Sequence, residues 1–189
     1  MTRMEMSGCL TERHLMLFGT IVQWFARYEV LMQEVMATAL GSDSAAVMLL
    51  TRSLAFGDKR RALLSLLRHR RVPRDQFDAV HAYLEIPHTF NMLCDDIKHA
   101  GWIAGTSPNS IQPDWILRPA PTVRPMRMAA DTVAEDFLTD EDERQEYTLD
   151  SLGEAAETLG RNYELLSGYV GEVGLIERRM DEAASSRRA

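Results

Sequence analysis

The sequence predicts an all-α protein, an antiparallel bundle of four main helices with a long irregular arm before the last helix. Two observations lead to this fold class. Long segments towards both ends of the chain repeat apolar residues at steps of three and four, the spacing of one helix face. Between residues 101 and 147 this periodicity is lost, and prolines and glycines accumulate. We therefore expect one helical domain over residues 1–189, with the 101–147 arm inserted between the third and last helices.

The first helix is expected from Thr11, a suitable N-cap, to Gly41, a suitable end. Glu29 occupies a position of this helix where the spacing predicts an apolar residue. It is therefore either a partly buried carboxylate with a hydrogen-bonding or charged partner, or part of a surface turn. A helix with two apolar stripes lies deep in a bundle or also forms a subunit interface, which is our basis for expecting a homodimer. One stripe contains Leu15, Phe18, Val22, Phe25, Met32 and Met36, and the other contains Leu17, Ile21, Trp24, Tyr28, Leu31 and Val35.

The second helix is expected over residues 44–71, after an N-cap at Ser42 or Asp43. Gly57 predicts a break or bend inside it, because glycine weakens a helix interior. Pro73 ends it, since the residue before a proline avoids the helical conformation.

The third and last helices are marked by their first residues. The third should begin near Pro73 and run towards Ile97, with a kink or short break at Pro87, which removes one backbone hydrogen bond. The last should begin at Thr148 or Asp150, where heptad-like apolar spacing starts.

The arm contains short segments with weaker patterns. Trp115–Leu117 and Thr122–Met128 can supply a small β-hairpin, and Ala130–Phe137 a short helix. Asp140–Glu146 is an acidic run that we expect to be solvated. A connection of this length is usually functional or mobile.

Composition limits the class of protein. Hydrophobic residues make up 46% of the chain and charged residues 26%, as in an ordinary globular protein. The net charge of -7 argues against a protein that coats bulk DNA or an anionic membrane. Cys9 and Cys94 are too few for a disulfide framework, and we find neither a signal segment nor a membrane span, so a cytoplasmic location is expected. The sequence gives no sign of a small-molecule cofactor.

An ionisable stripe follows the third predicted helix. Three imidazoles and two carboxylates in it suit a divalent metal, but Pro87 interrupts the register, and we identify no second element that would complete such a site. We therefore assign no metal. The stripe, at steps of three and four, is His81, Glu85, His88, Met92, Asp95 and His99.

Three segments together resemble the HEPN superfamily of small bacterial proteins. They are Phe18–Glu29, Phe56-Gly57-Asp58-Lys59, and Asp95 through Trp102. The resemblance extends over about residues 15–180. It implies a helical bundle that pairs as a homodimer. Many members are metal-independent RNA-cutting toxins or defence proteins, whose signature is an arginine, a polar residue, a few further residues and a histidine near a helix end.

Only part of that signature is present. His99 matches the catalytic histidine, and Trp102 matches an aromatic residue frequent just beyond it, while Cys94 takes the place of the arginine and Asp95 that of the polar residue. An arginine there would bind the scissile phosphate, whereas a cysteine cannot, and Asp95 with Asp96 would repel it.

Two further interpretations concern these histidines. Arg74-Asp75 followed by His81 gives a second, looser match to the motif near the start of the third helix. His99 also fits a purely structural role, with its ring hydrogen-bonded to Asp95 one turn earlier.

Positive charge is concentrated in one segment. Arg61, Arg68 and Arg71 should share a helix face that can contact phosphates, or that is simply solvated. The cluster as a whole is Lys59, Arg60, Arg61, Arg68, Arg70, Arg71 and Arg74.

Three functional hypotheses follow. The favoured one is a non-catalytic or regulatory HEPN-like homodimer that binds RNA, a nucleotide or a protein partner in a bacterial stress or phage-defence setting. The others are an active ribonuclease that uses His99 with an arginine from elsewhere, and a plain helical interaction module. The catalytic candidate is His99, and the binding candidates are Asp95, Trp102, His88, Arg61, Arg68 and Arg71.

Overall fold

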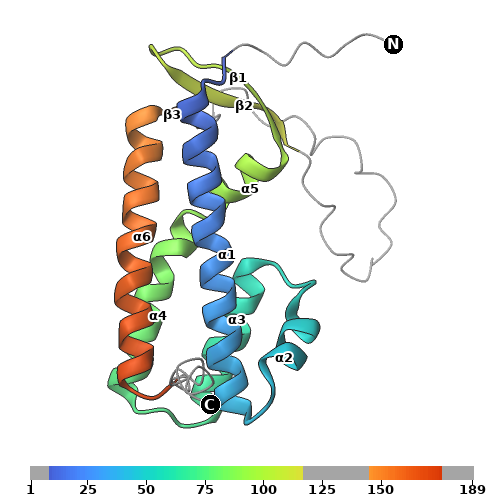
Figure 1. Ribbon diagram of the computed structural model, residues 1–189, viewed down its shortest axis with the longest axis vertical. Helices are drawn as coiled ribbons and strands as arrows, with labels where there is room; N and C mark the ends of the chain where they lie inside the picture. Colours follow the sequence, from blue (N-terminus) through green and yellow to red (C-terminus); the bar gives the residue numbers. More distant parts are fainter. Residues whose placement is uncertain (1–8, 117–144, 176–189) are drawn as a thin grey trace, which may run out of the picture. The chain divides into compact units, whose positions relative to one another are not determined.

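The computed structural model describes residues 9–116 and 145–175, and it confirms a mostly helical fold with a small antiparallel sheet (Figure 1). The elements are α1 (Glu12–Leu40), α2 (Ser44–Thr51), α3 (Phe56–His69), α4 (Arg74–Thr89), α5 (Asn91–His99), β1 (Ala100–Ala104), β2 (Ser110–Ile116), β3 (Tyr147–Thr148) and α6 (Leu149–Glu172). Among these residues, none of the helices is both long and apolar enough to cross a lipid bilayer.

The chain divides into two compact units. The first unit is Met1–Thr20 with Met92–Glu154, and the second is Ile21–Asn91 with Ala155–Ala189. The first therefore holds α5 from Met92 onwards and the sheet, and the second holds α2, α3 and α4. Parts of α1 and α6 belong to each.

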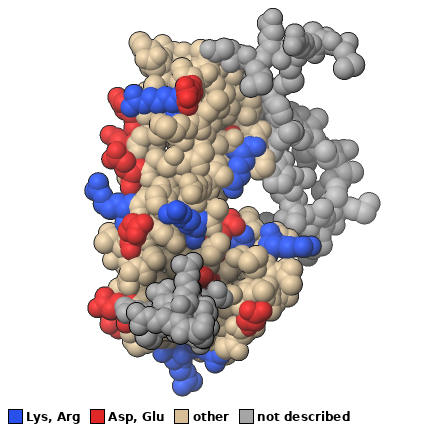
Figure 2. All heavy atoms as spheres, in the orientation of Figure 1, with Lys and Arg blue, Asp and Glu red and all other residues tan. Residues whose placement is uncertain are grey.

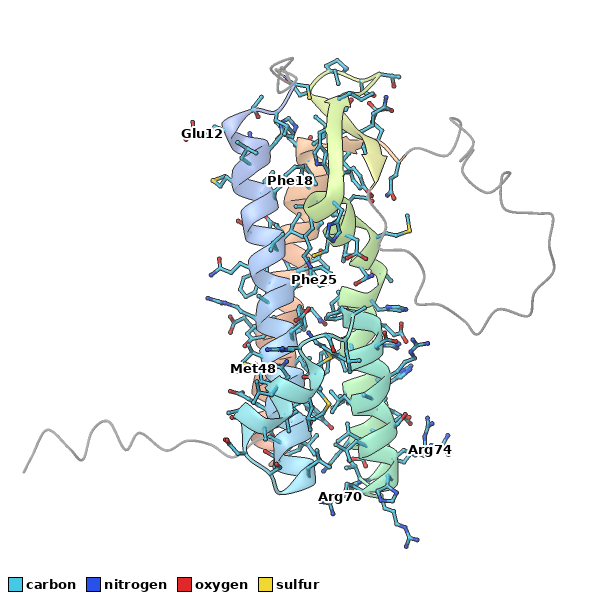
Figure 3. All side chains as sticks on the ribbon, turned by 90° about the vertical axis from the view of Figure 1, so that its right-hand side faces the viewer. Glu12, Phe18, Phe25, Met48, Arg70 and Arg74 are labelled. Carbon is cyan, nitrogen blue, oxygen red and sulfur yellow. The ribbon has the colours of Figure 1, made fainter. Side chains whose placement is uncertain are left out.

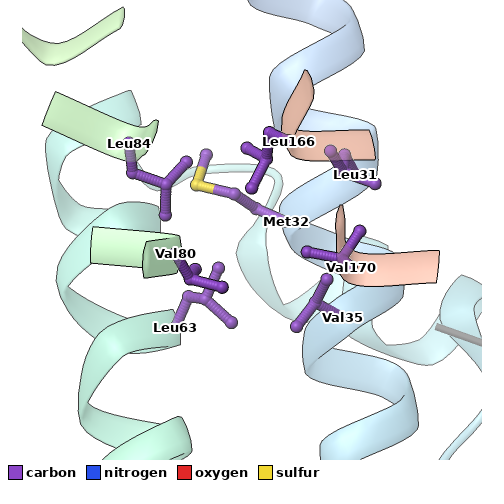
Figure 4. A pocket seen from close by; sticks show the side chains of 8 residues that line it. All are labelled: Leu31, Met32, Val35, Leu63, Val80, Leu84, Leu166 and Val170. Carbon is purple, nitrogen blue, oxygen red and sulfur yellow. The ribbon is translucent and has the colours of Figure 1, made fainter. Parts of the chain in front are cut away.

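Four helices form the core of the second unit, as the bundle prediction requires. Their apolar side chains point towards one another around a cavity of about 10 Å³ (Figure 4). That volume suits at most one water molecule, and the lining is wholly apolar, so the cavity is a packing defect rather than a ligand site. The lining residues are Leu31, Met32 and Val35 of α1, Leu63 of α3, Val80 and Leu84 of α4, and Leu166 and Val170 of α6.

Both ends of α1 lie where the sequence predicts them. Thr11 Oγ1 accepts a hydrogen bond from the His14 backbone N–H (3.3 Å), and the Thr11 N–H donates to His14 Nδ1 (3.1 Å), a reciprocal cap with histidine as the third residue. Gly41, at φ 63°, ends the helix, and the next N–H, that of Ser42, donates to the Ala37 carbonyl.

Most residues of the two apolar stripes of α1 are buried by contacts within this chain. Phe18, Phe25, Met32 and Met36 of the first stripe and Ile21, Tyr28, Leu31 and Val35 of the second are buried. The structure thus accounts for the double stripe by burial within one chain, and the homodimer remains a prediction. Glu29 is the partly buried carboxylate of the first alternative, because Lys59 Nζ lies 2.5 Å from its Oε2.

The helix predicted over 44–71 is two helices, and the position of the break differs from the prediction. The chain leaves the helical path between Thr51 and Phe56, so Gly57 lies in the first turn of α3 instead of at a bend. Phe56 is buried and packs edge-on against Phe25, with ring centroids 5.1 Å apart. This contact fixes where α3 begins.

The sequence also misplaced the break in the third helix. Pro87 remains within α4, and the interruption falls at Phe90. Pro87 lacks the N–H that would bond the Tyr83 carbonyl one turn earlier, but Asn162 Nδ2 of α6 donates to that carbonyl instead (2.8 Å). The helix therefore continues past the proline without a buried, unpaired carbonyl.

The sheet has the order β1-β2-β3, with both pairs antiparallel. The first segment of the predicted hairpin, Trp115–Leu117, overlaps β2, which ends at Ile116 and pairs with the earlier strand β1, so the start of the expected irregular arm is regular structure. Thr122–Met128 and Ala130–Phe137 lie outside the described residues. Thr148 caps α6 as predicted, because its Oγ1 accepts the Ser151 N–H (3.0 Å) and its N–H donates to Ser151 Oγ (2.9 Å).

Candidate functional site

In the first unit, α5 turns inward the position at which the resemblance to the HEPN superfamily leads us to expect an arginine. Cys94, which occupies it, is only 1% exposed, and it lies on the buried face of α5 with Leu93 and Asp96. Asp95 and His99 are on the exposed face. A side chain at position 94 therefore points into the protein, where it cannot reach a bound phosphate.

Asp96 and Trp102 are part of the interior of the first unit. Asp96 accepts a hydrogen bond from the Tyr147 hydroxyl (3.0 Å), and burial together with this carboxylate raises the pKa of Tyr147. The Trp102 ring lies between Phe18 and Tyr147, at centroid distances of 4.8 and 5.8 Å. Trp102 is 9% exposed, so it is an interior anchor that offers little of its ring to a base.

The His99 side chain is exposed, and no hydrogen bond or ion pair joins it to a described residue. The hydrogen bond to Asp95 expected for a structural histidine is therefore not formed, although Asp95 is exposed on the same helix. The α5 sequence contains no arginine. The His99 imidazole is open to solvent, and the cation beside it on this helix is Lys98, which lacks the paired N–H donors that a guanidinium offers to a phosphate.

In the second unit, the basic segment has a distinct composition. Residues 59–74 hold seven Lys and Arg side chains and no Asp or Glu. Lys59 and Arg60 are buried and form ion pairs with Glu29 and Glu85, so they belong to the core and not to the surface cluster. The remaining five are exposed, and we call them the arginine surface: Arg61, Arg68, Arg70, Arg71 and Arg74.

The arginine surface is centred on the turn between α3 and α4. Figure 3 shows Arg70 and Arg74 directed away from the helices, and Lys and Arg side chains protrude at the lower end of Figure 2. Arg61 and Arg68 lie on α3 as predicted, but Arg71 lies beyond the end of this helix, at φ 55°, and so does not share their face. The half-exposed Asp58 pairs with Arg61, and the exposed Asp78 pairs with Arg74.

An aromatic series joins this surface to α4. The Arg68 guanidinium lies 5.0 Å from the centroid of the Phe77 ring, and Phe77 stacks on His81 at 6.1 Å with 21° between the rings. His81 Nε2 is 3.3 Å from Glu85 Oε1, which also pairs with Arg60. Phe77 was not among the predicted site residues, although its position four residues before His81 on one helix is a signal for such a stack.

The ionisable stripe from His81 to His99 is not continuous. Its first three members lie on α4 in the second unit, and the last three lie on α5 in the first unit, after the break at Phe90. His88 is exposed on α4. Within the described part of the chain, no three His, Cys, Asp or Glu residues are grouped so that they could hold a metal ion.

Comparison with known proteins adds no relative: no family model, no curated protein and no solved structure matches this chain.

Proposed function

We propose that this chain is a non-catalytic, HEPN-like protein that binds single-stranded RNA through its arginine surface, in the bacterial cytoplasm and in a stress or phage-defence setting. The observation that carries the proposal is the group of five exposed arginines without an acid between them in the sequence, one of which lies over an aromatic ring. The HEPN relationship rests on the sequence resemblance alone.

The chemistry of the surface favours RNA. Guanidinium groups form paired hydrogen bonds to phosphate oxygens, and each phosphate contact releases bound counterions. Sequence-tolerant recognition of single strands also uses stacking of bases on arginine and aromatic planes, which Arg68, Phe77 and the half-exposed His81 can provide. The chain is acidic overall, with a net charge of -7, so we expect binding to be local and not a general attraction to nucleic acid.

Features of the first unit support the absence of catalysis. A metal-independent ribonuclease needs a cation that stabilises the charge developing on the phosphate, besides a proton-transfer group. His99 is an exposed imidazole, but Cys94 is buried at the arginine position, and the cation that α5 does supply, Lys98, is a point charge without the paired donors of a guanidinium.

Binding is tested by fluorescence anisotropy with a labelled single-stranded RNA. We expect Arg68→Gln/Arg71→Gln to weaken binding by about tenfold or more, and to reduce the slope of log K against log salt by roughly 1.4, since each phosphate contact on a single strand contributes about 0.7. The matched control, Arg13→Gln/Arg161→Gln, removes two exposed arginines elsewhere and should bind like the wild type. Equal loss in both pairs, or no binding by the wild type, contradicts the proposal.

Catalysis is tested with the same RNA, incubated with purified protein and analysed on a denaturing gel. We expect intact RNA. Cleavage that His99→Ala abolishes, with an unchanged circular dichroism spectrum, would contradict the non-catalytic proposal and favour the ribonuclease alternative.

Competition with duplex DNA at the same phosphate concentration should be weaker than competition with unlabelled single-stranded RNA.

A further inference from the structure

A carboxylate lies at the end of the aromatic series on α4. Phe77, His81 and Glu85 follow one another at steps of four residues, so they share one face of this helix. Arg68 covers the Phe77 end of the series. Glu85 lies about 12 Å further along the helix axis than Phe77. A carboxylate repels phosphate groups, so Glu85 adds nothing to a contact with the RNA backbone.

Contacts within the protein use one oxygen of the Glu85 carboxylate. Arg60 Nη2 donates to Oε1, and His81 Nε2 lies 3.3 Å from the same oxygen. Within the described residues, no hydrogen bond or ion pair involves Oε2. The Glu85 side chain is 43% exposed, so a ligand can reach it from solvent. Oε2 therefore keeps two lone pairs that can accept hydrogen bonds from a ligand.

The Glu85 carboxylate is held in place before any ligand binds. The side chain of its partner Arg60 is only 11% exposed, and a buried guanidinium is costly without the carboxylate that neutralises it. Arg60 lies on α3 and Glu85 on α4, so the ion pair joins two helices of the second unit. An acceptor that is already fixed loses little side-chain entropy on binding, which favours its use in recognition.

The His81 ring provides a stacking plane beside this acceptor. The His81 side chain is 45% exposed, and its imidazole lies nearly parallel to the Phe77 ring, with 21° between them. Unpaired RNA bases commonly stack on aromatic side chains, histidine included. Because His81 Nε2 is only 3.3 Å from Glu85 Oε1, a base stacked on the imidazole brings its hydrogen-bonding edge to the carboxylate.

The four RNA bases differ in what they offer to a carboxylate. Guanine presents N1–H and N2–H side by side on its Watson–Crick edge, so both can donate to one acceptor group. Adenine and cytosine present a single amino group there, next to a ring nitrogen that is itself an acceptor. In uracil, N3–H lies between two carbonyl oxygens, which a carboxylate repels. A carboxylate beside a stacked base therefore favours guanine and disfavours uracil.

We infer that Glu85 makes the RNA site selective for guanine at one position, where the base stacks on His81 and donates its N1–H and N2–H to Glu85 Oε2. The arginine surface holds the phosphates of neighbouring nucleotides, and contacts elsewhere along the strand remain tolerant of sequence. The inference rests on the proposed binding of single-stranded RNA. It adds which base the surface prefers and which residue sets the preference.

Base preference is tested by fluorescence anisotropy with short labelled oligouridines that carry guanosine, inosine or uridine at one central position. We expect the guanosine oligomer to bind about tenfold more tightly than the all-uridine oligomer. Inosine should give an intermediate affinity, because it keeps N1–H but lacks the N2 amino group. Equal affinity for all three overturns the inference and leaves the proposed function standing. No binding of any oligomer contradicts the proposed function, and the inference falls with it.

Glu85→Gln removes the charge of the acceptor and keeps its size. We expect it to lower the ratio of guanosine to uridine affinity by about fivefold or more, while the affinity for the all-uridine oligomer stays the same or rises. A purely structural role of Glu85 would lower both affinities together. Glu164→Gln, at an exposed acid of α6, is the matched control and should keep the wild-type ratio. An unchanged ratio in Glu85→Gln, with an unchanged circular dichroism spectrum, overturns the inference.

A second variant leaves the Arg60–Glu85 ion pair in place, so it tests the site without unpairing a buried charge. His81→Ala removes the stacking plane, and the base is then no longer positioned against Oε2. We expect the ratio of guanosine to uridine affinity to fall towards one. A ratio equal to that of the wild type would show that His81 does not hold the guanine, and would overturn the inference.

Discussion

Asn162 links three polar groups in the second unit. Its Nδ2 donates to the Tyr83 carbonyl (2.8 Å) and to the Tyr28 hydroxyl (2.7 Å), and this hydroxyl donates to the Leu159 carbonyl (3.0 Å). Burial raises the pKa of Tyr28 to about 12, so the hydroxyl remains a donor throughout the physiological range. One amide thus satisfies a carbonyl left open by Pro87 and a hydroxyl in the core.

We expect Asn162→Ala to lower the free energy of unfolding by about 1–3 kcal/mol, because it leaves the Tyr83 carbonyl unpaired. Pro87→Ala supplies an N–H to that carbonyl. In the Pro87→Ala background the cost of Asn162→Ala should therefore be smaller, though not zero, since Tyr28 still loses its partner. Urea denaturation of the four proteins measures the coupling. An equal cost in both backgrounds would show that the Tyr83 carbonyl does not depend on Asn162.

Glu146 closes the loop between β1 and β2 in the first unit. Its carboxylate accepts hydrogen bonds from the Ser107 N–H (2.7 Å), from Thr106 Oγ1 (2.8 Å) and from Ser110 Oγ. These donors, Ser110 first, lower the pKa of Glu146 from 4.5 to about 2. The acidic run that the sequence predicts to be solvated therefore ends in a residue with a defined structural contact.

The lowered pKa predicts a pH dependence of stability. A carboxyl group with a lower pKa in the folded state stabilises the protein above its ordinary pKa, and this contribution is lost as the pH falls from 4.5 towards about 2. Thermal unfolding of wild type and Glu146→Gln should thus differ by a constant amount at pH 5–7. The difference should shrink between pH 4.5 and 2. A difference that is independent of pH over the whole range would mean that the charge on Glu146 plays no part.

At the scale of one element, three of the four glycines of α6, namely Gly153, Gly160 and Gly168, have different surroundings. A Cβ at Gly160 would lie 2.9 Å from Cζ2 of the Trp24 ring, whereas Gly153 and Gly168 have nothing within 4 Å. Trp24 also packs against Tyr163, with centroids 5.6 Å apart. Gly160 therefore allows the close approach of the indole, and the other two glycines only weaken the helix.

Substitution of these glycines by alanine should separate the two cases. Gly168→Ala should stabilise the protein by about 0.5–1 kcal/mol, because alanine is the better helix former and the site is open. Gly160→Ala should lose this gain or become destabilising, since the added methyl group displaces Trp24. Chemical denaturation of both variants, followed by circular dichroism, provides the comparison. A stabilisation by Gly160→Ala equal to that of Gly168→Ala would contradict the packing argument.

Helix ends were predictable from the sequence, and helix breaks were not. Thr11, Gly41 and Thr148 act through their own side-chain and backbone chemistry, which adjacent residues complete. The break before α3 and the continuity of α4 through Pro87 depend instead on Phe25 and Asn162, which are distant in the sequence. The residues next to each break do not reveal these distant partners.

For the whole molecule, the bundle was predictable because apolar periodicity over long segments fixes which residues are buried. The sheet was not predictable, since its register depends on which residues of neighbouring strands lie opposite each other, for example Trp102 of β1 and Pro113 of β2. For the candidate site, the sequence indicated the exposed arginines but not the burial of Cys94. Which face of the short helix α5 points inward is decided by neighbours such as Tyr147, across 51 residues of sequence.

The conformation of Arg71 has a consequence for protein engineering. A side chain at φ 55° raises the energy of the folded chain by roughly 1 kcal/mol, and glycine is the usual residue where a helix ends in this way. A search for thermostable variants would therefore select Arg71→Gly early. The same substitution removes a guanidinium from the arginine surface. Arg71→Gly would therefore raise the thermal stability and at the same time remove a proposed contact with RNA.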